Sequence, residues 1–173
     1  MSGHPLALRP ARRADAEAVA RVQGAAWRNT YRGLVPDSYM DRQDRNLDRR
    51  IAGIAEWLEP PHIAFVAVTP ADHVVGYAVG GSSRDPTPPD GELYAIYLLA
   101  GWQGVGAGRL LLDAVRQALA DRGMLSMVVW VLADNPARRF YERMGGVPVG
   151  SRRIAFDERT LEEVSYVWSP PGG

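Results

Sequence analysis

Residues 103–108, with the sequence QGVGAG, are where residue type and spacing point most clearly to binding chemistry. Their glycines let backbone N–H groups approach a ligand closely, and a helix that begins there would direct its positive dipole end at a phosphate. A connection selected only for tight packing explains the same glycines equally well. Two nucleotide-binding patterns fail: a P-loop needs a Lys, which the chain lacks, and a dinucleotide fingerprint starting at Gly104 needs glycine where Arg109 stands.

Four segments in chain order resemble the GNAT superfamily of acyl-CoA-dependent N-acyltransferases. Residues 103–108 match the family's coenzyme pyrophosphate loop, Q/R-x-x-G-x-G/A, and residues 96–103 resemble the strand before it. Residues 135–145 are similar to the family segment in which an Asn precedes A-x-x-x-Y-x-x-x-G, and residues 27–34 to its helix-to-helix corner. Two positions depart from the pattern, because the family often has Pro at Ala100 and an aromatic residue at Gly146; neither carries chemistry.

The resemblance implies an α/β fold with a GNAT-like mixed sheet of about seven strands, in the order βααβββαβαββ with flanking helices. It also implies acetyl-CoA as the acetyl donor, bound like an added strand along a sheet edge between splayed strands. The positions that it assigns to the coenzyme are the backbone of Leu98 and Leu99, the loop formed by Gln103, Gly104, Val105, Gly106, Ala107 and Gly108, and Asn135.

Asn135 also has a purely structural explanation. It precedes Pro136, and Asn followed by Pro is a common start of a helix. The two roles are compatible. Arg138 and Arg139 follow in the first turn, where their charge is unfavourable to the helix dipole; they are either solvated or attracted to coenzyme phosphates.

The resemblance makes Tyr141 the general acid, because in family members with this Tyr its hydroxyl protonates the leaving thiolate. The ordinary pKa of Tyr, about 10, suits transfer to a thiolate whose acid has a pKa of about 8.5. Spacing alone favours a different role, since Tyr141 shares a helix stripe with Ala137, Phe140 and Met144 and would be a core aromatic residue.

An amine acceptor must lose a proton, so a base or an ordered water is required. Glu92 heads the predicted central strand where several GNAT enzymes place a glutamate, and a solvated charge at a strand end is the alternative. His4, His62 and His73 are poorer candidates, and their spacing does not suit a metal site. Without a cysteine or a G-x-S-x-G elbow, direct attack of the amine on the thioester is the expected route.

The acceptor pocket is expected to be framed by the loop of residues 82–91 and by four aromatic side chains. Such rings bind amines by apolar contact or by cation–π attraction, while Trp27 and Trp130 could equally be core residues. The four aromatic residues are Trp27, Tyr31, Tyr94 and Trp130.

Hydrophobic periodicity supplies the elements that must position these residues. Strands are expected at 6–10, 63–68, 74–80, 93–99, 127–132, 149–156 and 161–168. Helices are expected at 15–27 with Asp15 as cap, at 47–58 with Leu47, Ile51, Ile54 and Leu58 inward, at 106–122 and at 136–144. In the helix at 106–122 the inward residues are Leu110, Leu111, Ala114, Val115 and Ala118. Because a helix connects the strands at 93–99 and 127–132, they should be parallel.

The 173 residues fit one domain, 1–173, with a frayed tail at 169–173. Twenty acidic side chains balance twenty basic ones, so neither nucleic acid nor a membrane surface is favoured as a partner. With no cysteine, no signal peptide and no apolar run near 20 residues, we expect a cytoplasmic protein without a metal. A homodimer is compatible with these features.

The predicted activity is therefore acetyl transfer from acetyl-CoA to a primary amine. Two rivals stay open: a non-catalytic acyl-CoA-binding or sensor module, and an acetyltransferase that acts on proteins instead of small molecules. The presence of Tyr141 argues against the first rival. The second stays open because the acceptor is chosen by loops whose specificity cannot be deduced from the sequence.

Overall fold

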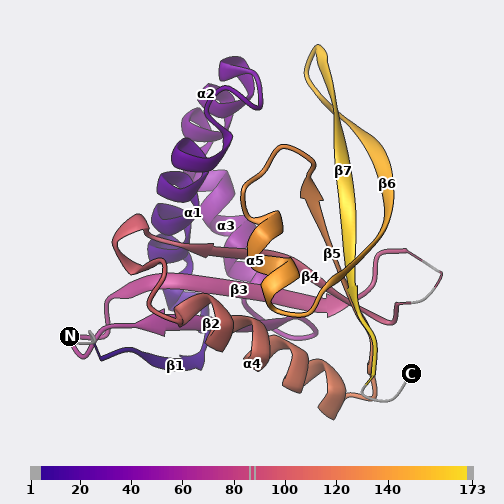
Figure 1. Cartoon of the computed structure of the whole chain (residues 1–173). Coiled ribbons are helices and arrows are strands. Elements are labelled where there is room, and N and C mark those ends of the chain that lie inside the picture. The colour runs from indigo at the N-terminus through magenta and orange to yellow at the C-terminus, as the bar shows by residue number, and fades with distance from the viewer. Residues whose placement is uncertain (1–4, 86, 88, 171–173) are drawn as a thin grey trace.

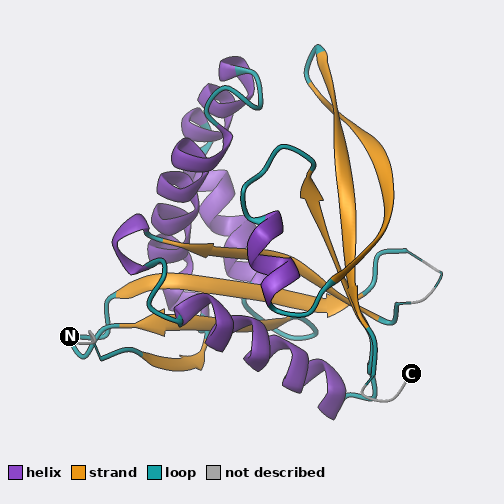
Figure 2. Ribbon diagram, in the orientation of Figure 1, coloured by secondary structure: helices purple, strands orange, loops and turns teal. Residues whose placement is uncertain are grey.

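Seven strands form one mixed sheet in the order β1-β2-β3-β4-β5-β7-β6, as Figures 1 and 2 show. The computed structural model describes residues 5–85, 87 and 89–170, so His4 and the tail from residue 171 lie outside it. The strands are β1 Ala7–Pro10, β2 Ile63–Val68, β3 Val74–Ser82, β4 Gly91–Leu98, β5 Met127–Leu132, β6 Val147–Phe156 and β7 Arg159–Trp168. Each expected strand is present, and the α/β fold class is confirmed.

Five α-helices flank the sheet in the described part of the chain. They are α1 Ala16–Tyr31, α2 Asp37–Arg45, α3 Leu47–Trp57, α4 Ala107–Asp121 and α5 Arg138–Arg143. Three helices, and not two, therefore separate β1 from β2. Helices α2 and α3 are separated at Asn46, whose φ of −102° and ψ of 34° are not helical. Its side-chain N–H donates to the Arg42 carbonyl at 3.0 Å.

Helices α1 and α3 cover one face of the sheet, on the far side of β2 to β4 in Figure 1. Their core joins Val19 and Val22 of α1 and Ile54 of α3 to strand residues such as Val66 and Val79. The predicted stripe of α3 packs there except at its first member, since Leu47 is 44% exposed. The side chain of Asp15 does not cap α1: it accepts hydrogen bonds from the Arg12 N–H at 2.7 Å and from the Arg9 guanidinium.

Helix α4 covers the opposite face (Figure 1). Leu111, Leu112, Val115 and Leu119 face the sheet and are fully buried. Leu110 was expected among them but is 50% exposed, so the buried stripe lies one residue further along the helix.

Strands β4 and β5 are parallel, as predicted, but they pair over only a short stretch. The register joins Gly91, Glu92 and Leu93 to Met127, Val128 and Val129 and then stops. Beyond it the two strands diverge, and α5 lies in the mouth of the V that they form (Figure 1). The predicted splay of the central strands is thus present.

A β-bulge in β4 lies beside this splay. Gly80 of β3 pairs with Leu93 and Val79 pairs with Ala95, so Tyr94 has no partner across the ladder. As a result Leu93 packs in the core under α4 whereas Ala95 packs in the core under α1. Bulges commonly occur next to functional sites because they re-aim side chains.

Helix α2 contacts the turn between β6 and β7. Asp157 in this turn accepts hydrogen bonds from the Ser38 hydroxyl at 2.9 Å and from the Arg42 guanidinium, and the Tyr39 ring packs edge-on to Phe156 at 5.1 Å. We call this the α2–hairpin contact. It joins two parts of the chain that are more than a hundred residues apart in sequence.

Candidate active site

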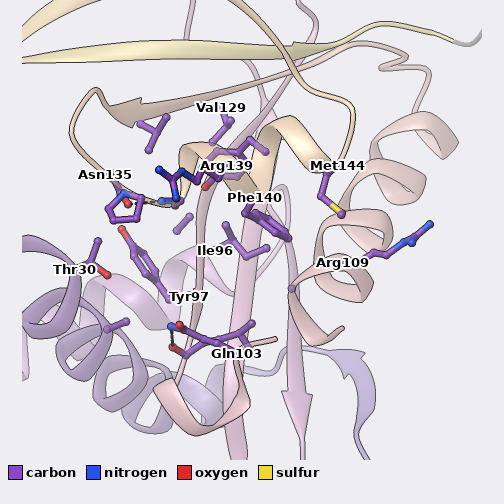
Figure 3. A pocket seen from close by; sticks show the side chains of 18 of the residues that line it. Thr30, Ile96, Tyr97, Gln103, Arg109, Val129, Asn135, Arg139, Phe140 and Met144 are labelled. Carbon is purple, nitrogen blue, oxygen red and sulfur yellow. Dashed lines mark hydrogen bonds between the residues drawn. The ribbon is translucent and has the colours of Figure 1, made fainter. Parts of the chain in front are cut away.

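A cleft with a volume of about 880 Å³ lies where β4 and β5 diverge. Its walls come from the end of α1, from β4 and β5, from the loop before α4, and from the segment that leads into α5. In Figure 3 Thr30, Ile96, Tyr97, Asn135 and Phe140 are among the side chains around it.

The glycine loop lines one end of the cleft. Gly104 and Gly106 have φ values of 75° and 88°, in the left-handed region that favours glycine, and Gly106 is the residue before α4 begins. Within the described residues, no intramolecular acceptor is found for the backbone N–H groups of residues 104–109. The loop therefore offers a row of free donors at the positive end of a 15-residue helix.

The members of the predicted loop are not equally placed. Gln103, Gly104, Gly106 and Gly108 line the cleft, and the Gln103 side chain donates to the Leu98 carbonyl at 3.4 Å. The side chains of Val105, which is exposed, and of Ala107, which is buried, are not part of the lining. Only the backbone groups of these two residues could serve a ligand.

The edge of β4 that faces the cleft differs from the prediction by one residue. The Leu99 N–H donates to the Val75 carbonyl at 2.9 Å, and the Leu99 carbonyl accepts from Trp102 at 2.9 Å. Both backbone groups of Leu99 are thus occupied, which argues against its assignment to the coenzyme. Because backbone groups alternate along a strand, Ile96 and Leu98 are the residues that direct theirs toward the splay.

Asn135 serves the helix start and the cleft together. It is buried, its side-chain oxygen accepts the Ala137 N–H at 2.8 Å, and it lines the cleft. The following arginines separate: Arg138 donates to the Tyr166 hydroxyl and to the Ala133 carbonyl, both at 2.9 Å, whereas Arg139 lines the cleft (Figure 3). The Asn135 side chain thus closes the turn that leads into α5, which begins at Arg138, two residues later than predicted, with Ala137 as its cap residue.

Tyr141 lies in the wall of the cleft with a ring that belongs to the core. It is 6% exposed and packs at 6.0 Å from the rings of both Tyr166 and Trp168. Burial, and to a smaller extent the nearby Tyr31, raises the pKa of the Tyr141 hydroxyl well above its ordinary value. That hydroxyl makes no hydrogen bond to any described residue, and its raised pKa keeps it protonated at neutral pH.

Three of the four predicted aromatic residues, Tyr31, Tyr94 and Trp130, line the cleft. The Tyr31 hydroxyl lies 3.1 Å from that of Tyr97, and burial raises the pKa of both. Trp27 is not part of the lining; it packs edge-on to Tyr31 at 5.3 Å and stacks on Tyr39. This geometry argues against its predicted place in the acceptor pocket.

Glu92 is 2% exposed and is held by one neighbour. Its carboxylate accepts hydrogen bonds from the Arg84 backbone N–H at 2.9 Å, from Nε at 3.0 Å and from Nη2. It lines a second pocket of about 200 Å³ instead of the main cleft. Since three donors from Arg84 already occupy the carboxylate, the geometry argues against the predicted role of Glu92 as the base.

Several cleft residues were not singled out from the sequence. Ile96 and Tyr97 belong to the predicted strand at 93–99, which is apolar throughout, so the sequence did not distinguish the two faces of that strand. The basic residues Arg109, Arg139 and Arg143 line the cleft, and of these only Arg139 had been weighed as a coenzyme contact. Their places on the first turn of α4 and on α5 could have suggested the others.

The described residues contain neither a metal-binding cluster nor a membrane-spanning helix. No group of three or more His, Cys, Asp or Glu side chains is arranged to hold a metal ion. None of the helices in that part of the chain is both long and apolar enough to span a membrane.

The comparisons with known proteins agree with this geometry. The family model described as "Acetyltransferase (GNAT) family" matches residues 25–146. YuaI, an uncharacterized N-acetyltransferase of Bacillus subtilis (strain 168), is 33% identical over 168 residues, which cover 93% of this chain and 91% of YuaI. The chain belongs to the GNAT family and is an acyltransferase.

Solved structures show the same fold. The structure of yncA from Salmonella typhimurium, with its cofactor acetyl-CoA, aligns with a TM-score of 0.72 at 20% identity and covers 98% of this chain and 96% of that one. PaiA N-acetyltransferase from Thermoplasma acidophilum, in complex with coenzyme A, aligns with a TM-score of 0.68 at 16% identity, covering 92% and 98%.

Proposed function

We propose that this protein transfers the acetyl group of acetyl-CoA to a primary amine by direct attack. The observation that carries the proposal is the single cleft that contains both the free N–H groups before α4 and the unpartnered hydroxyl of Tyr141. A pyrophosphate site and a proton donor are the two parts that such a transfer needs from the protein.

The residues around the cleft fit coenzyme A. The N–H groups of residues 104–109 would hold the pyrophosphate, and the outward backbone groups of Ile96, together with the Leu98 N–H, would pair with the amides of the pantetheine arm. Arg109, Arg139 and Arg143 add positive charge along the same cleft for the remaining phosphate. Asn135 lies on the opposite wall, on the segment that follows β5.

The bound thioester supplies an activated acetyl group, and the protein supplies position and a proton. As the amine forms its bond to the carbonyl carbon, the carbon–sulfur bond breaks and the sulfur takes the proton of the Tyr141 hydroxyl. Because burial raises the pKa of Tyr141, the hydroxyl is protonated throughout the neutral range. The excess proton of the amine leaves to water and the Tyr141 phenolate regains a proton from water, because the described lining of the main cleft holds neither a carboxylate nor a histidine.

The test is release of coenzyme A thiol on mixing the protein with acetyl-CoA and a panel of primary amines and peptides. Because the chain has no cysteine, a thiol reagent reports the product alone. Turnover with small amines supports the proposal, and turnover with peptides only assigns a protein acceptor. Binding of coenzyme A by calorimetry without turnover on any acceptor overturns it in favour of a binding module.

A further inference from the structure

The second pocket adjoins the cleft through a shared wall. It is lined by Arg84, Asp85, Glu92, Trp130 and Arg152, and Trp130 lines the main cleft as well. A molecule that occupies both spaces would therefore lie along the Trp130 side chain. This arrangement suits an acceptor whose amine reacts in the cleft while another of its groups is held outside it.

The Arg84 guanidinium is fixed on two sides. Nε and Nη2 donate to the buried Glu92 carboxylate, and the group lies over the Tyr94 ring, 5.0 Å from its centroid. The Arg84 side chain is nevertheless 62% exposed, and its Nη1 has no partner among the described residues. Glu92 thus orients a guanidinium whose free edge stays available.

Arg152 repeats this arrangement on the other side of the pocket. Its guanidinium lies over the Trp130 ring, 4.0 Å from the centroid, and its Nε donates to Glu163 at 2.9 Å. Both of its terminal nitrogens lack a partner among the described residues. Two oriented guanidinium groups with free N–H edges match the planar, two-oxygen geometry of a carboxylate.

The acidic groups around the pocket do not offer an equal site for a cation. Glu92 is saturated by Arg84, and Glu163 is engaged by Arg152. Asp85 is exposed, and one of its oxygens accepts both the N–H and the hydroxyl of Thr87. The groups of the pocket that lack a hydrogen-bond partner among the described residues are therefore mainly N–H donors.

We propose that the pocket between Arg84 and Arg152 binds a carboxylate of the acceptor, so that the enzyme acetylates amines of the amino-acid type. This inference rests on the proposed acetyl transfer. Arg84 and Arg152 bind the carboxylate, Glu92 is a positioning residue that acts through Arg84, and Trp130 separates the carboxylate from the reacting amine.

The experiment compares amino acids with the amines obtained by removing their carboxyl group, side chain by side chain. For wild type, kcat/KM is expected to be at least tenfold higher for the amino acid. Arg152→Gln should abolish this preference by raising KM for the amino acid at least tenfold more than KM for the decarboxylated amine. Arg153→Gln, an exposed neighbour on the same strand, is the control and should leave the preference intact.

Asp85→Asn distinguishes a pocket that binds a carboxylate from one that binds a cation. Removing this negative charge should lower KM for the amino acid if a carboxylate binds, and would raise KM if the pocket held a cation. The inference is overturned if wild type prefers decarboxylated amines or aminophosphonates to amino acids. It is also overturned if Arg152→Gln lowers kcat/KM equally for the amino acid and for the decarboxylated amine. Absence of turnover with every amine in the panel would instead overturn the proposed acetyl transfer.

Discussion

The hydroxyl groups of Tyr31 and Tyr97 lie 3.1 Å apart and join α1 to β4 across the cleft wall. Tyr141 is near enough to Tyr31 for the charge of one to raise the pKa of the other. Four tyrosines line the cleft: the Tyr31 and Tyr97 hydroxyls are bonded to each other, and the Tyr94 hydroxyl donates to the Ser82 carbonyl. The Tyr141 hydroxyl makes no hydrogen bond to a described residue, which directs the first prediction to it.

Replacing Tyr141 with Phe should lower kcat by about 10²-fold, the lower end of the range for general acid catalysis. The ring still packs on Tyr166 and Trp168, so acetyl-CoA affinity and melting temperature should change little. Steady-state kinetics and calorimetry measure the two effects. Tyr31→Phe is the matched control, and an equal loss of kcat in both variants would remove the special role of Tyr141.

The raised pKa of Tyr141 also predicts a pH dependence of stability. A group whose folded pKa lies above its unfolded value stabilises the protein below the unfolded pKa, and that contribution is lost as the pH rises. The unfolding free energy of wild type should therefore fall as the pH rises above about 10, the ordinary pKa of Tyr. Tyr141→Phe should show a shallower fall in denaturant titrations, and identical slopes would contradict the assignment.

Gly106→Glu should weaken the binding of coenzyme A strongly. A side chain at Gly106 meets no atom within 4 Å, so the carboxylate would extend into open space at the phosphate end of the cleft. The positive φ of 88° strains any side chain there, so Gly106→Gln is the control that shares the strain without the charge. Calorimetry should give an affinity at least tenfold lower for Glu than for Gln; equal values would place the pyrophosphate elsewhere.

Glu92→Gln distinguishes a base from a positioning residue. If Glu92 holds Arg84, kcat/KM for an amino acid should fall about tenfold at every pH, because an amide N–H would face the Arg84 donors. A loss concentrated at low pH, where little free amine exists, would restore Glu92 as the base.

Since removing one partner of a buried ion pair is destabilising, the double variant Glu92→Gln with Arg84→Gln is measured beside it. It should recover stability in a thermal melt without recovering activity. Recovery of activity together with stability would contradict the proposed contact between Arg84 and the acceptor.

Asp15→Asn tests the contact that ties β1 to the start of α1. Both Asp15 oxygens accept from the Arg9 guanidinium, at 2.8 and 2.9 Å, and this bond holds the pKa of Asp15 below its ordinary value. The variant should lose about 1–3 kcal/mol of unfolding free energy at pH 7. Because a lowered pKa stabilises only above the unfolded value, the difference should shrink as the pH falls below 4.

Asp72→Asn is the comparison for this variant. Asp72 accepts a single bond from Arg9 and its side chain is 62% exposed, so its loss should cost at most about 1 kcal/mol. Equal losses in the two variants, measured by denaturant titration at pH 7, would show that the paired bonds and the burial of Asp15 add no stability.

Periodicity was sufficient to predict the strands and the splay, because a parallel pair joined by a glycine loop and a helix allows few arrangements. It was insufficient where a local irregularity decides the outcome. The bulge at Tyr94 changes which face each later residue of β4 occupies, and nothing in the alternation of the apolar run marked it.

The structure argues against the predicted roles of Leu99, Trp27 and Glu92 for one physical reason. Each depends on a partner distant in sequence or in an irregular loop: Val75 for Leu99, Tyr39 for Trp27 and Arg84 for Glu92. Residue type and spacing describe what a side chain can do, whereas these partners decide which of its groups are already occupied. The local bond of the Asn135 side chain is easier to predict, because its partner lies only two residues away.

The α2–hairpin contact has a consequence for how the enzyme would respond to ionic strength. Helix α2 follows the end of α1 that lines the cleft, and β7 pairs with β5, which forms the other wall. Asp157 and Arg42 are accessible to solvent, so dissolved salt screens their attraction. Higher salt should loosen the two walls together, which would speed the escape of acetylated product while leaving the phosphate end of the cleft, built on α4, in place.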